Sequence, residues 1–245
     1  VRAYASMLGY SLDPDLIARR AQEVVAQGFT ATKWFFRHGP AEGEEGVRRN
    51  LALIRAVREA VGSDVEIMFD AWSSWDVPYT RRMAALAAAY RPWWFEEPVP
   101  ADMIPQYAEL RRTVSGVLIA GGEHEYTRWG FRELISRGCA DVIQPDLAWS
   151  GGISEVRRIA AMAAAYDLVV VPHNGVLQPW ATHLMLATPN CPLAEYVVFY
   201  GPNDLAPPPV MLGELRPEGG RIRPSEAAGA GVDLDLAELE RQTAG

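Results

Sequence analysis

Eight short apolar runs, separated by longer segments with helical periodicity, constrain the fold of this chain more than any other feature of its sequence. Most runs are almost continuously hydrophobic, as expected for strands that are covered on both faces in a parallel sheet. They begin at Ala3, Thr30, Val65, Trp93, Val117, Ala140, Leu168 and Ala194. The intervening segments carry helical signals, such as the Asp13-Pro14 start that precedes apolar residues three or four positions apart. This alternation predicts an α/β fold with a parallel sheet.

A TIM-type (β/α)8 barrel, in its (β/α)7β variant, is the form of parallel sheet that the sequence favours. The chain has 245 residues, close to the roughly 250 that such barrels need. No glycine-rich phosphate fingerprint follows the first run, which disfavours an open dinucleotide-binding sheet. The alternation stops after Phe199. We therefore expect residues 1–200 to form the barrel domain and residues 201–245 to form a C-terminal extension, which packs on the barrel or on a missing segment. In that extension we expect a hairpin between Met211 and Pro224 and a short helix from Asp235.

The composition excludes several classes of protein. The formal net charge is -8 and the sequence pI is about 5.1, which argues against a nucleic-acid or anionic-membrane binder. Two cysteines cannot build a disulfide-rich scaffold or a cysteine zinc cluster. No apolar stretch approaches the ~18–20 residues of a membrane span, and no secretory leader is visible. We expect a cytoplasmic protein, and since the chain begins at Val1, in strand-like sequence, we expect an N-terminal portion to be missing.

Polar side chains follow the apolar runs at nearly constant intervals. One βα unit needs about 24 to 28 residues, so intervals of 26, 27, 23, 27 and 22 residues place one such side chain at the end of each consecutive strand. In barrels of this type the reacting groups lie at the carboxyl ends of the strands. Lys33 ends an earlier run. The sequence therefore predicts a ring formed by Asp70, Glu96, Glu123, Asp146, His173 and Glu195.

The first three acids of the ring, Asp70, Glu96 and Glu123, are expected on adjacent strands. Three ionised carboxylates in a partly dry pocket repel one another unless they take up protons or share a cation. Oxygen ligands without His or Cys suit a hard divalent ion, and Mg²⁺ keeps coordination positions open for substrate oxygens. We therefore expect a Mg²⁺ site. The alternative is that these acids cap helices or pair with arginines, for which the candidates are Arg81, Arg82 and Arg112.

Asp146 and His173 end the next two strands and form a candidate catalytic pair. A carboxylate that holds one imidazole nitrogen fixes the tautomer and raises the basicity, which leaves the other nitrogen free to move a proton. His124 directly follows the third carboxylate of the ring, and supporting that carboxylate or binding substrate are both open to it. Glu97 and Glu125 are neighbours of ring residues, and we expect them on other faces because side chains alternate along a strand.

Six motifs that contain the ring residues resemble those of the enolase superfamily, in its mandelate racemase and muconate-lactonising branch. They cover the chain from about residue 30 to residue 200 and read FDAW, WFEEP, GGEH, QPDLAWSGGISE, VPHNG and AEYVVF. Members of that superfamily combine a Lys or His base with Mg²⁺ that stabilises an ene-diolate. The resemblance implies that Asp70, Glu96 and Glu123 are the Mg²⁺ ligands. It also implies that Asp146 and His173 are the general base and acid, and that Glu195 forms hydrogen bonds close to the substrate carboxylate.

Within that superfamily the segments FDAWSSWDVPYT, GGEHEYT, QPDLAWSGG and LVVVPHNG resemble acid-sugar dehydratases of the rhamnonate dehydratase type. The resemblance implies a lyase of sugar acid catabolism, a hydro-lyase that removes the proton α to a carboxylate. Loss of the 3-hydroxyl then gives a 2-keto-3-deoxy acid.

Two departures from the family pattern bear on the reaction. Members that racemise or cycloisomerise usually carry Lys-x-Lys or Lys-x-His on the second strand, whereas this chain reads Lys33-Trp34-Phe35. An apolar Phe35 disfavours a two-base reaction, and Lys33 would then bind the substrate carboxylate or pair with a ligand carboxylate. The second departure is that nothing before Val1 corresponds to the N-terminal capping domain of the family.

Two alternatives to the dehydratase remain open at this point. One is a racemase, epimerase or cycloisomerase of the same superfamily that acts on a carboxylate substrate, and the other is a non-catalytic metal-binding barrel. In the dehydratase interpretation, Lys33 and His124 bind the substrate. The expected partners are a small sugar acid and further copies of the chain in a homo-oligomer, without nucleic acid or membrane.

Overall fold

A computed structural model describes residues 1–198, 211–212 and 215–243 of the chain. Its centre is one sheet of eight strands in the order β7-β6-β5-β4-β3-β2-β1-β8, in which all neighbours are parallel. Each expected apolar run contains one strand of this sheet. The strands are β1 (Arg2–Ser6), β2 (Ala31–Phe35), β3 (Glu66–Asp70), β4 (Trp94–Glu96), β5 (Leu118–Gly121), β6 (Val142–Ile143), β7 (Val169–Val170) and β8 (Leu193–Val197).

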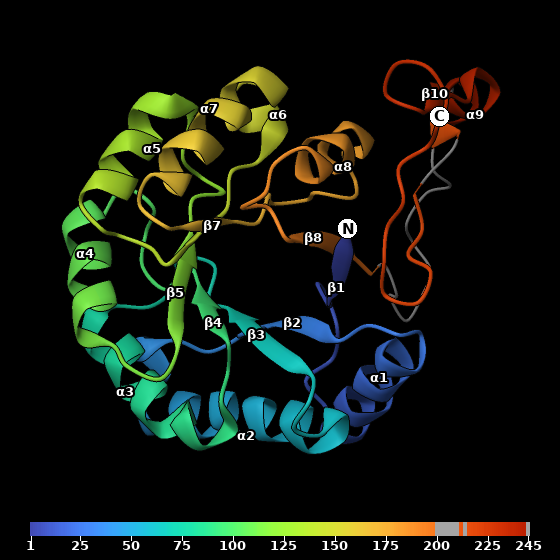
Figure 1. The fold of residues 1–245 in the computed structure, drawn as a ribbon. Helices are drawn as coiled ribbons and strands as arrows, with labels where there is room; N and C mark the ends of the chain where they lie inside the picture. The colour runs from blue at the N-terminus through green and yellow to red at the C-terminus, as the bar shows by residue number, and fades with distance from the viewer. Residues whose placement is uncertain (199–210, 213–214, 244–245) are drawn as a thin grey trace.

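The sheet curls until its two edge strands meet, as Figure 1 shows. No ladder joins β7 to β8, but backbone hydrogen bonds bridge the seam. Val170 N donates to Asn190 O at 2.8 Å, and Val176 N donates to Glu195 O at 3.0 Å. The sheet is therefore a TIM-type barrel with a loosely paired seam, and the predicted fold class is confirmed.

Within the eight-stranded sheet, each connection between consecutive strands contains at least one α-helix. These helices lie outside the strands (Figure 1). Helix α1 begins at Pro14 with Asp13 as its N-cap, as the Asp13-Pro14 signal predicted. None of the helices in the described residues has an apolar stretch long enough to cross a membrane. The barrel helices are α1 (Pro14–Ala26), α2 (Gly43–Val61), α3 (Val77–Ala87), α4 (Ile104–Thr113), α5 (Thr127–Ser136), α6 (Leu147–Ser150), α7 (Ile153–Ala164) and α8 (Pro179–Leu186).

Inside the barrel, an apolar layer lies beneath a polar one. Every strand, or in one case the residue just after it, contributes one buried side chain to the apolar layer, which consists of Tyr4, Ala31, Met68, Trp94, Ala120, Val142, Val171 and Leu193. Because side chains alternate along a strand, the residue two positions further on faces the interior again. On most strands that residue is polar, and the set is Ser6, Lys33, Asp70, Glu96, Gln144, His173 and Glu195. The apolar layer thus closes the barrel, and the polar residues form the floor of a site at the carboxyl ends of the strands.

The C-terminal extension pairs with the start of β1. A turn at Gly219-Gly220 brings Glu218 and Arg221 into an antiparallel bridge. Gly220 O accepts a hydrogen bond from Ala3 N at 2.8 Å, and Ile222 N donates to Val1 O at 2.8 Å. This part of the extension therefore packs on the barrel.

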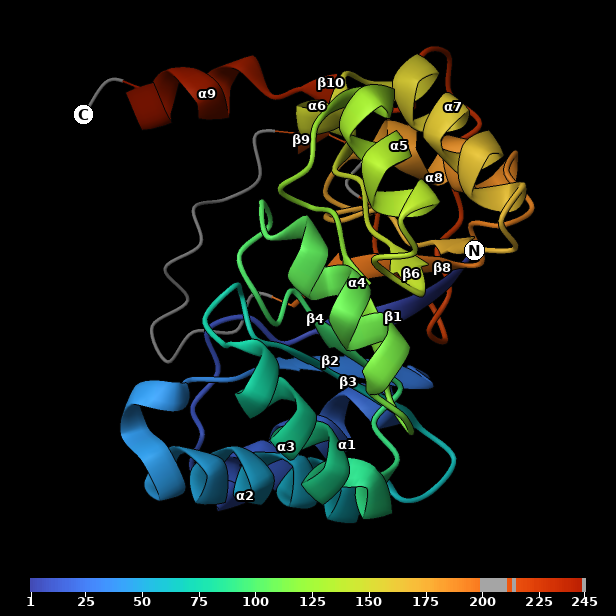
Figure 2. The same ribbon diagram turned by 90° about the vertical axis from the view of Figure 1, so that its left-hand side faces the viewer.

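The Glu218–Arg221 bridge forms a hairpin turn within the segment where a hairpin was expected, but the start of that segment pairs elsewhere. Strand β9 (Met211–Leu212) pairs with β10 (Asp233–Leu234) rather than with the residues up to Pro224. The expected last helix is present as α9 (Leu236–Thr243), and it projects away from the barrel in both ribbon views (Figures 1 and 2). The expected domain boundary at residue 200 and residues 201–210 lie outside the described residues, so the division of the chain stays a prediction.

We expect Gly220→Ala to destabilise the fold more than Gly219→Ala in the same turn. Both residues have positive φ, at +69° and +55°, but a Cβ on Gly220 would lie 2.1 Å from Gly28 O, whereas a Cβ on Gly219 would meet nothing within 4 Å. Overpacking of this kind costs about 1–3 kcal/mol, so the free energy of unfolding should fall by that additional amount in Gly220→Ala. Urea denaturation of the two variants measures the difference, and equal losses would contradict the close approach of the extension to Gly28.

Candidate functional site

Asp70, Glu96 and Glu123 converge at the carboxyl ends of three adjacent strands. Asp70 ends β3 and lies in register with Glu96, which ends β4. Glu123 follows β5 after Gly122, whose φ of +119° turns the chain out of its alternation. Each side chain offers a carboxylate oxygen, and the three oxygens lie within 4.8 Å of one another. The structure therefore brings together the three acids that were predicted to meet.

Lys33 is a cation that Asp70 and Glu96 share with Glu195 in the structure. Its side chain is 1% exposed, and Nζ forms ion pairs with Glu96, with Glu195 at 2.9 Å and with Asp70 at 3.6 Å. Burial lowers the pKa of Lys33, but the negative charges of Glu195 and Glu96 outweigh it and raise the pKa well above its usual value. The lysine stays charged, so it neutralises part of the polar layer, and of the two roles considered for it the structure shows the pairing with carboxylates.

One lysine is not enough to neutralise all the acids at this point. Burial, followed by the negative charge of Glu96, raises the pKa of Asp70 well above its usual value. Burial raises the pKa of Glu123 to about 7, and Glu96 and Glu97 add to the rise against the opposing effect of His173. The group would therefore hold protons near neutral pH unless a further cation binds. Of the arginines considered as alternative partners, Arg81 pairs with Glu109 and Arg82 with Glu44 on the surface. Among the described residues, Arg112 forms no ion pair with the three acids either.

The donor set and its spacing fit a hard divalent cation. Mg²⁺ binds oxygen ligands at about 2.0–2.1 Å, so ligands on opposite sides of the ion lie about 4.2 Å apart. Oxygens within 4.8 Å of one another are close enough for side-chain adjustment to bring them around one ion. Members of this set would also be relieved of their mutual repulsion by the ion.

Asp146 and His173 form a hydrogen-bonded pair beside the carboxylates. Asp146 Oδ2 lies 3.0 Å from His173 Nδ1, while Oδ1 accepts hydrogen bonds from Ala148 N and Trp149 N at 2.8 and 3.0 Å and so begins α6. The other imidazole nitrogen, Nε2, lies 3.5 Å from Glu123 Oε2. The predicted pair is therefore assembled, with Nδ1 toward Asp146 and Nε2 toward the site.

The electrostatic surroundings of His173 make it a stronger base than free imidazole. Burial lowers its pKa, but the hydrogen bond to Asp146 and the charges of Glu195 and Glu123 raise it to a net value of about 9. Burial raises the pKa of Asp146, while hydrogen bonds from His173, Trp149 and Gln178 lower it, with a net fall. Asp146 therefore remains an anion that holds the imidazole.

Glu195, the last predicted ring residue, lies on β8 and contacts Lys33 from that strand. One oxygen accepts a hydrogen bond from Asn174 N at 2.8 Å, and the other is 2.9 Å from Lys33 Nζ. Burial opposes ionisation, but the charges of Lys33 and His173 lower the pKa of Glu195 to about 2. Glu195 is therefore a fixed anion in the floor of the site.

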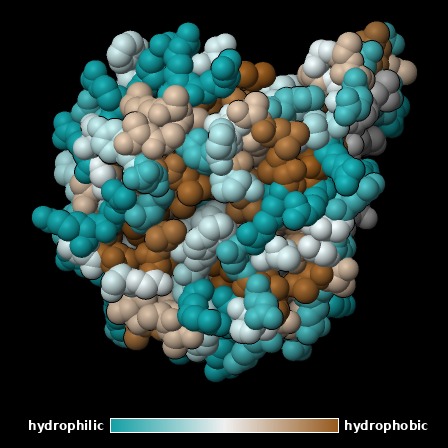
Figure 3. All heavy atoms as spheres, in the orientation of Figure 1, coloured by the Kyte–Doolittle hydropathy of each residue, from teal (hydrophilic) through white to brown (hydrophobic). Residues whose placement is uncertain are grey.

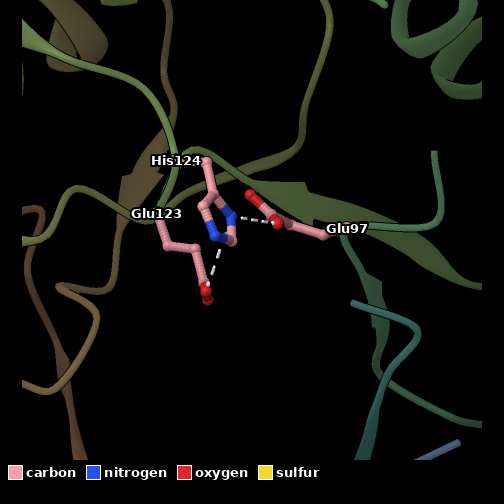
Figure 4. A group of neighbouring side chains, drawn as sticks. All are labelled: Glu97, Glu123 and His124. Atoms are coloured by element: carbon pink, nitrogen blue, oxygen red, sulfur yellow. Dashed lines mark hydrogen bonds and ion pairs between the residues drawn. The ribbon is translucent and has the colours of Figure 1, made fainter. Parts of the chain in front are cut away.

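Alternation along the strand suggested that Glu97 lies on another face than Glu96, but this prediction is wrong. β4 ends at Glu96, and Glu97 has a φ of +37°, so the two-residue alternation does not continue through it. Its buried carboxylate lies 2.7 Å from His124 Nδ1, as Figure 4 shows. The same nitrogen is 3.6 Å from Glu123 Oε1 (Figure 4). Glu97, Glu123 and His124 thus form a second cluster that shares Glu123 with the first.

Several side chains that hold the ring residues were missed by sequence reasoning. Gln144 Nε2 and Trp94 Nε1 donate to Glu96 Oε2 at 2.7 and 3.0 Å. Gln178 Nε2 donates to Asp146 Oδ2 at 3.0 Å. Gln144 lies two positions before Asp146, so strand alternation could have identified it, but Gln178 follows a loop and carries no such signal.

Aromatic residues surround the site at its open side. Trp149 is 46% exposed, and its ring lies 5.6 Å from that of His124 and 5.8 Å from that of His173. Trp72 is 70% exposed and lines a cavity of about 590 Å³ together with His124. Figure 3 shows hydrophilic side chains over much of the outer rim of the molecule and hydrophobic ones further in.

The sequence of the chain is similar to that of a known protein. It is 42% identical over 219 residues to an L-rhamnonate dehydratase of Saccharopolyspora erythraea, and the match covers 87% of this chain and 56% of that protein. The chain therefore spans little more than half the length of this relative.

Solved structures superpose on almost the whole chain. The 3,6-anhydro-D-galactonate cycloisomerase of Zobellia galactanivorans matches with a TM-score of 0.84 and 30% identity, covering 98% of this chain and 65% of that one. A mandelate racemase/muconate lactonizing enzyme-like protein of Roseovarius sp. TM1035 matches with a TM-score of 0.85 and 30% identity, covering 99% and 64%. Residues 16–239 match the family described as enolase C-terminal domain-like. The chain belongs to this family, within the enolase superfamily.

Proposed function

We propose that the protein is a Mg²⁺-dependent acid-sugar dehydratase, a hydro-lyase that converts a sugar acid to a 2-keto-3-deoxy acid. The observation that carries the proposal is the Asp146–His173 pair. In this pair, His173 Nε2 points away from Asp146 and lies 3.5 Å from Glu123 of the acidic trio. A base next to a cation site is the arrangement needed to remove a proton α to a carboxylate. The L-rhamnonate dehydratase at 42% identity supports the same reaction.

In this proposal His173 removes the α-proton through Nε2. Asp146 keeps the proton of Nδ1 in place and stabilises the imidazolium that forms. The proton that His173 gains is returned to the departing 3-hydroxyl, so that water leaves as the C3–O bond breaks. The enol that remains tautomerises to the 2-keto acid.

In this proposal the substrate carboxylate binds at the cation that the acidic trio would hold, above Lys33 and its ion pairs. Asp70, Glu96 and Glu123 would hold Mg²⁺, which when bound supplies positive charge for the negative charge that develops on the carboxylate. Lys33 Nζ lies between Glu96 and Glu195 and adds a fixed positive charge at the same place. Glu195 restrains Lys33 through an ion pair of 2.9 Å and would form hydrogen bonds close to the substrate carboxylate.

The side of the barrel that carries β2 favours a reaction with one base. Phe35 has no group that exchanges protons, and its ring lies 5.4 Å from Lys33 Nζ. Lys33 is itself held in three ion pairs. A racemase or epimerase needs an acid on the face opposite His173, so dehydration is favoured over racemisation. Cycloisomerisation is the second candidate reaction, because one solved relative is a cycloisomerase by name.

The full-length gene product, incubated with a library of sugar acids and Mg²⁺ in heavy water, should release a 2-keto acid that reacts with semicarbazide. His173→Ala should lower this activity by about 10²–10⁴-fold, the usual contribution of a general acid–base group, and should abolish exchange of the α-proton. His183→Ala, on α8, is the matched control and should retain activity. Recovery of two stereoisomers would identify an epimerase. A product of unchanged mass that contains a new ring or lactone would identify a cycloisomerase. Mg²⁺ binding without proton exchange would indicate a non-catalytic barrel.

Binding of Mg²⁺ at pH 7 should release protons. Burial and neighbouring charges raise the pKa of Glu123 to about 7 without a cation, whereas a coordinating carboxylate must be deprotonated. Titration calorimetry in buffers of different ionisation enthalpy should therefore give different apparent heats. Glu123→Gln should weaken binding, while Glu109→Gln, on the exposed face of α4, should not. Heats that do not depend on the buffer would contradict the protonated carboxylate.

Asp146→Asn should shift the pH profile of kcat/KM toward lower pH on its acidic side. His173 must be neutral to accept a proton, so activity rises with pH through its pKa. Asp146 is a principal cause of the raised pKa of His173, at about 9, and its removal lowers that pKa. The rising limb should therefore move down while the maximal rate falls, because the amide no longer stabilises the imidazolium. An unchanged limb would show that the profile reports another group.

A further inference from the structure

Glu97 is a buried carboxylate that the proposed reaction does not use. It is 1% exposed, and its backbone carbonyl accepts a hydrogen bond from Ser73 N at 2.6 Å. Oε2 accepts a hydrogen bond from Ser73 Oγ at 3.2 Å and lies 2.7 Å from His124 Nδ1. The loop after β3 and the chain after β4 therefore hold this carboxylate against His124 from two sides.

This contact determines which nitrogen of His124 carries the proton. A carboxylate accepts hydrogen bonds, so Nδ1 is the donor and the lone pair of the neutral ring is on Nε2. Within the described residues, Nε2 itself makes no hydrogen bond. His124 side-chain atoms are 34% exposed, and Trp149 packs near the ring. Nε2 is thus available to accept a hydrogen bond from a bound molecule.

His124 lines a cavity of about 590 Å³ between the loops that follow β3, β4 and β5. Its other lining residues are Trp72, Ser73, Pro100, Ala101, Asp102 and Glu125. Asp102 and Glu125 make the cavity unfavourable for a second carboxylate or a phosphate, because like charges repel. Hydroxyl groups suit the polar atoms, and the apolar faces of a carbon chain suit Trp72 and the proline. The lining therefore fits an uncharged polyol.

We propose that Glu97 is a positioning residue, which holds His124 so that Nε2 accepts a hydrogen bond from a hydroxyl of the substrate's neutral polyol end. The cavity would then select sugar acids with one carboxylate over diacids and phosphorylated acids. This inference rests on the proposed function, since the carboxylate of the same molecule must lie at the acidic trio.

Binding should be measured without turnover, in full-length protein that carries His173→Ala and is loaded with Mg²⁺. Titration calorimetry should show that an aldonate binds and that the aldarate of the same carbon skeleton binds at least tenfold more weakly. Adding Glu97→Leu, which cannot accept a hydrogen bond from His124, should weaken aldonate binding by about 3- to 10-fold, the range for one hydrogen bond. His124→Asn should cause a similar loss, and the two changes together should cause no more than either alone.

Two further readouts separate positioning from a merely structural role. Nitrogen-15 spectra of the imidazoles should show a His124 ring protonated at Nδ1, identified by its absence in His124→Asn. Glu97→Leu, whose side chain cannot accept a hydrogen bond from Nδ1, should change that tautomer. The Mg²⁺ stoichiometry should be one per chain with and without Glu97→Gln, and the affinity for Mg²⁺ should be the same in the two proteins.

Each of the following results would overturn the inference. Unchanged aldonate affinity in Glu97→Leu, or additive losses in the double variant, would show that Glu97 does not act through His124. Tight binding of the aldarate, or no binding of any sugar acid, would show that the cavity does not take a polyol. Two Mg²⁺ ions per chain, or a loss of Mg²⁺ in Glu97→Gln, would place Glu97 in a cation site. Failure of the proposed function is distinct, since it would appear as sugar-acid binding with no turnover by the unmutated protein.

Discussion

The ion cluster around Lys33 is the constraint on which the site depends. A lysine that is 1% exposed cannot stay charged in an apolar barrel unless carboxylates surround it. Carboxylates from three other strands do so, which ties β2, β3, β4 and β8 together at their carboxyl ends. The apolar layer below excludes water and strengthens these attractions. The same dryness raises the pKa of Asp70 and of Glu123, which is the physical argument for the cation that we propose at this point.

The two sides of the cluster have different chemistry. On the side of β6 and β7, Asp146 orients an imidazole whose second nitrogen reaches the trio. On the side of β2, Lys33 is immobilised by ion pairs and Phe35 carries no exchangeable proton. Under the proposed function, this asymmetry would confine proton transfer to one face of a bound substrate. Relatives in this superfamily carry the names of several reactions, and the contrast between the two faces supports the elimination that we propose.

The loops beyond the strands decide what else the site can hold. Glu97, Ser73 and Trp72 all have positive φ without being glycine. Such conformations are costly and persist only where surrounding contacts enforce them. Here the hydrogen bonds between Ser73 and Glu97 provide those contacts. They direct the carboxylate of Glu97 toward His124, so the conformation of two loops shapes the cavity next to the acidic trio.

The sequence by itself determined the barrel and its ring of polar residues, because strand alternation and the length of a βα unit are local properties that repeat along the chain. Asp70, Glu96, Asp146 and His173 could be placed at strand ends in this way. Only the tertiary structure decided that Lys33 pairs with three carboxylates, that Glu97 turns toward His124 and that Gln178 holds Asp146. Those contacts join residues far apart in the chain across loops with irregular backbone, where periodicity ends and the direction of a side chain depends on what packs against it.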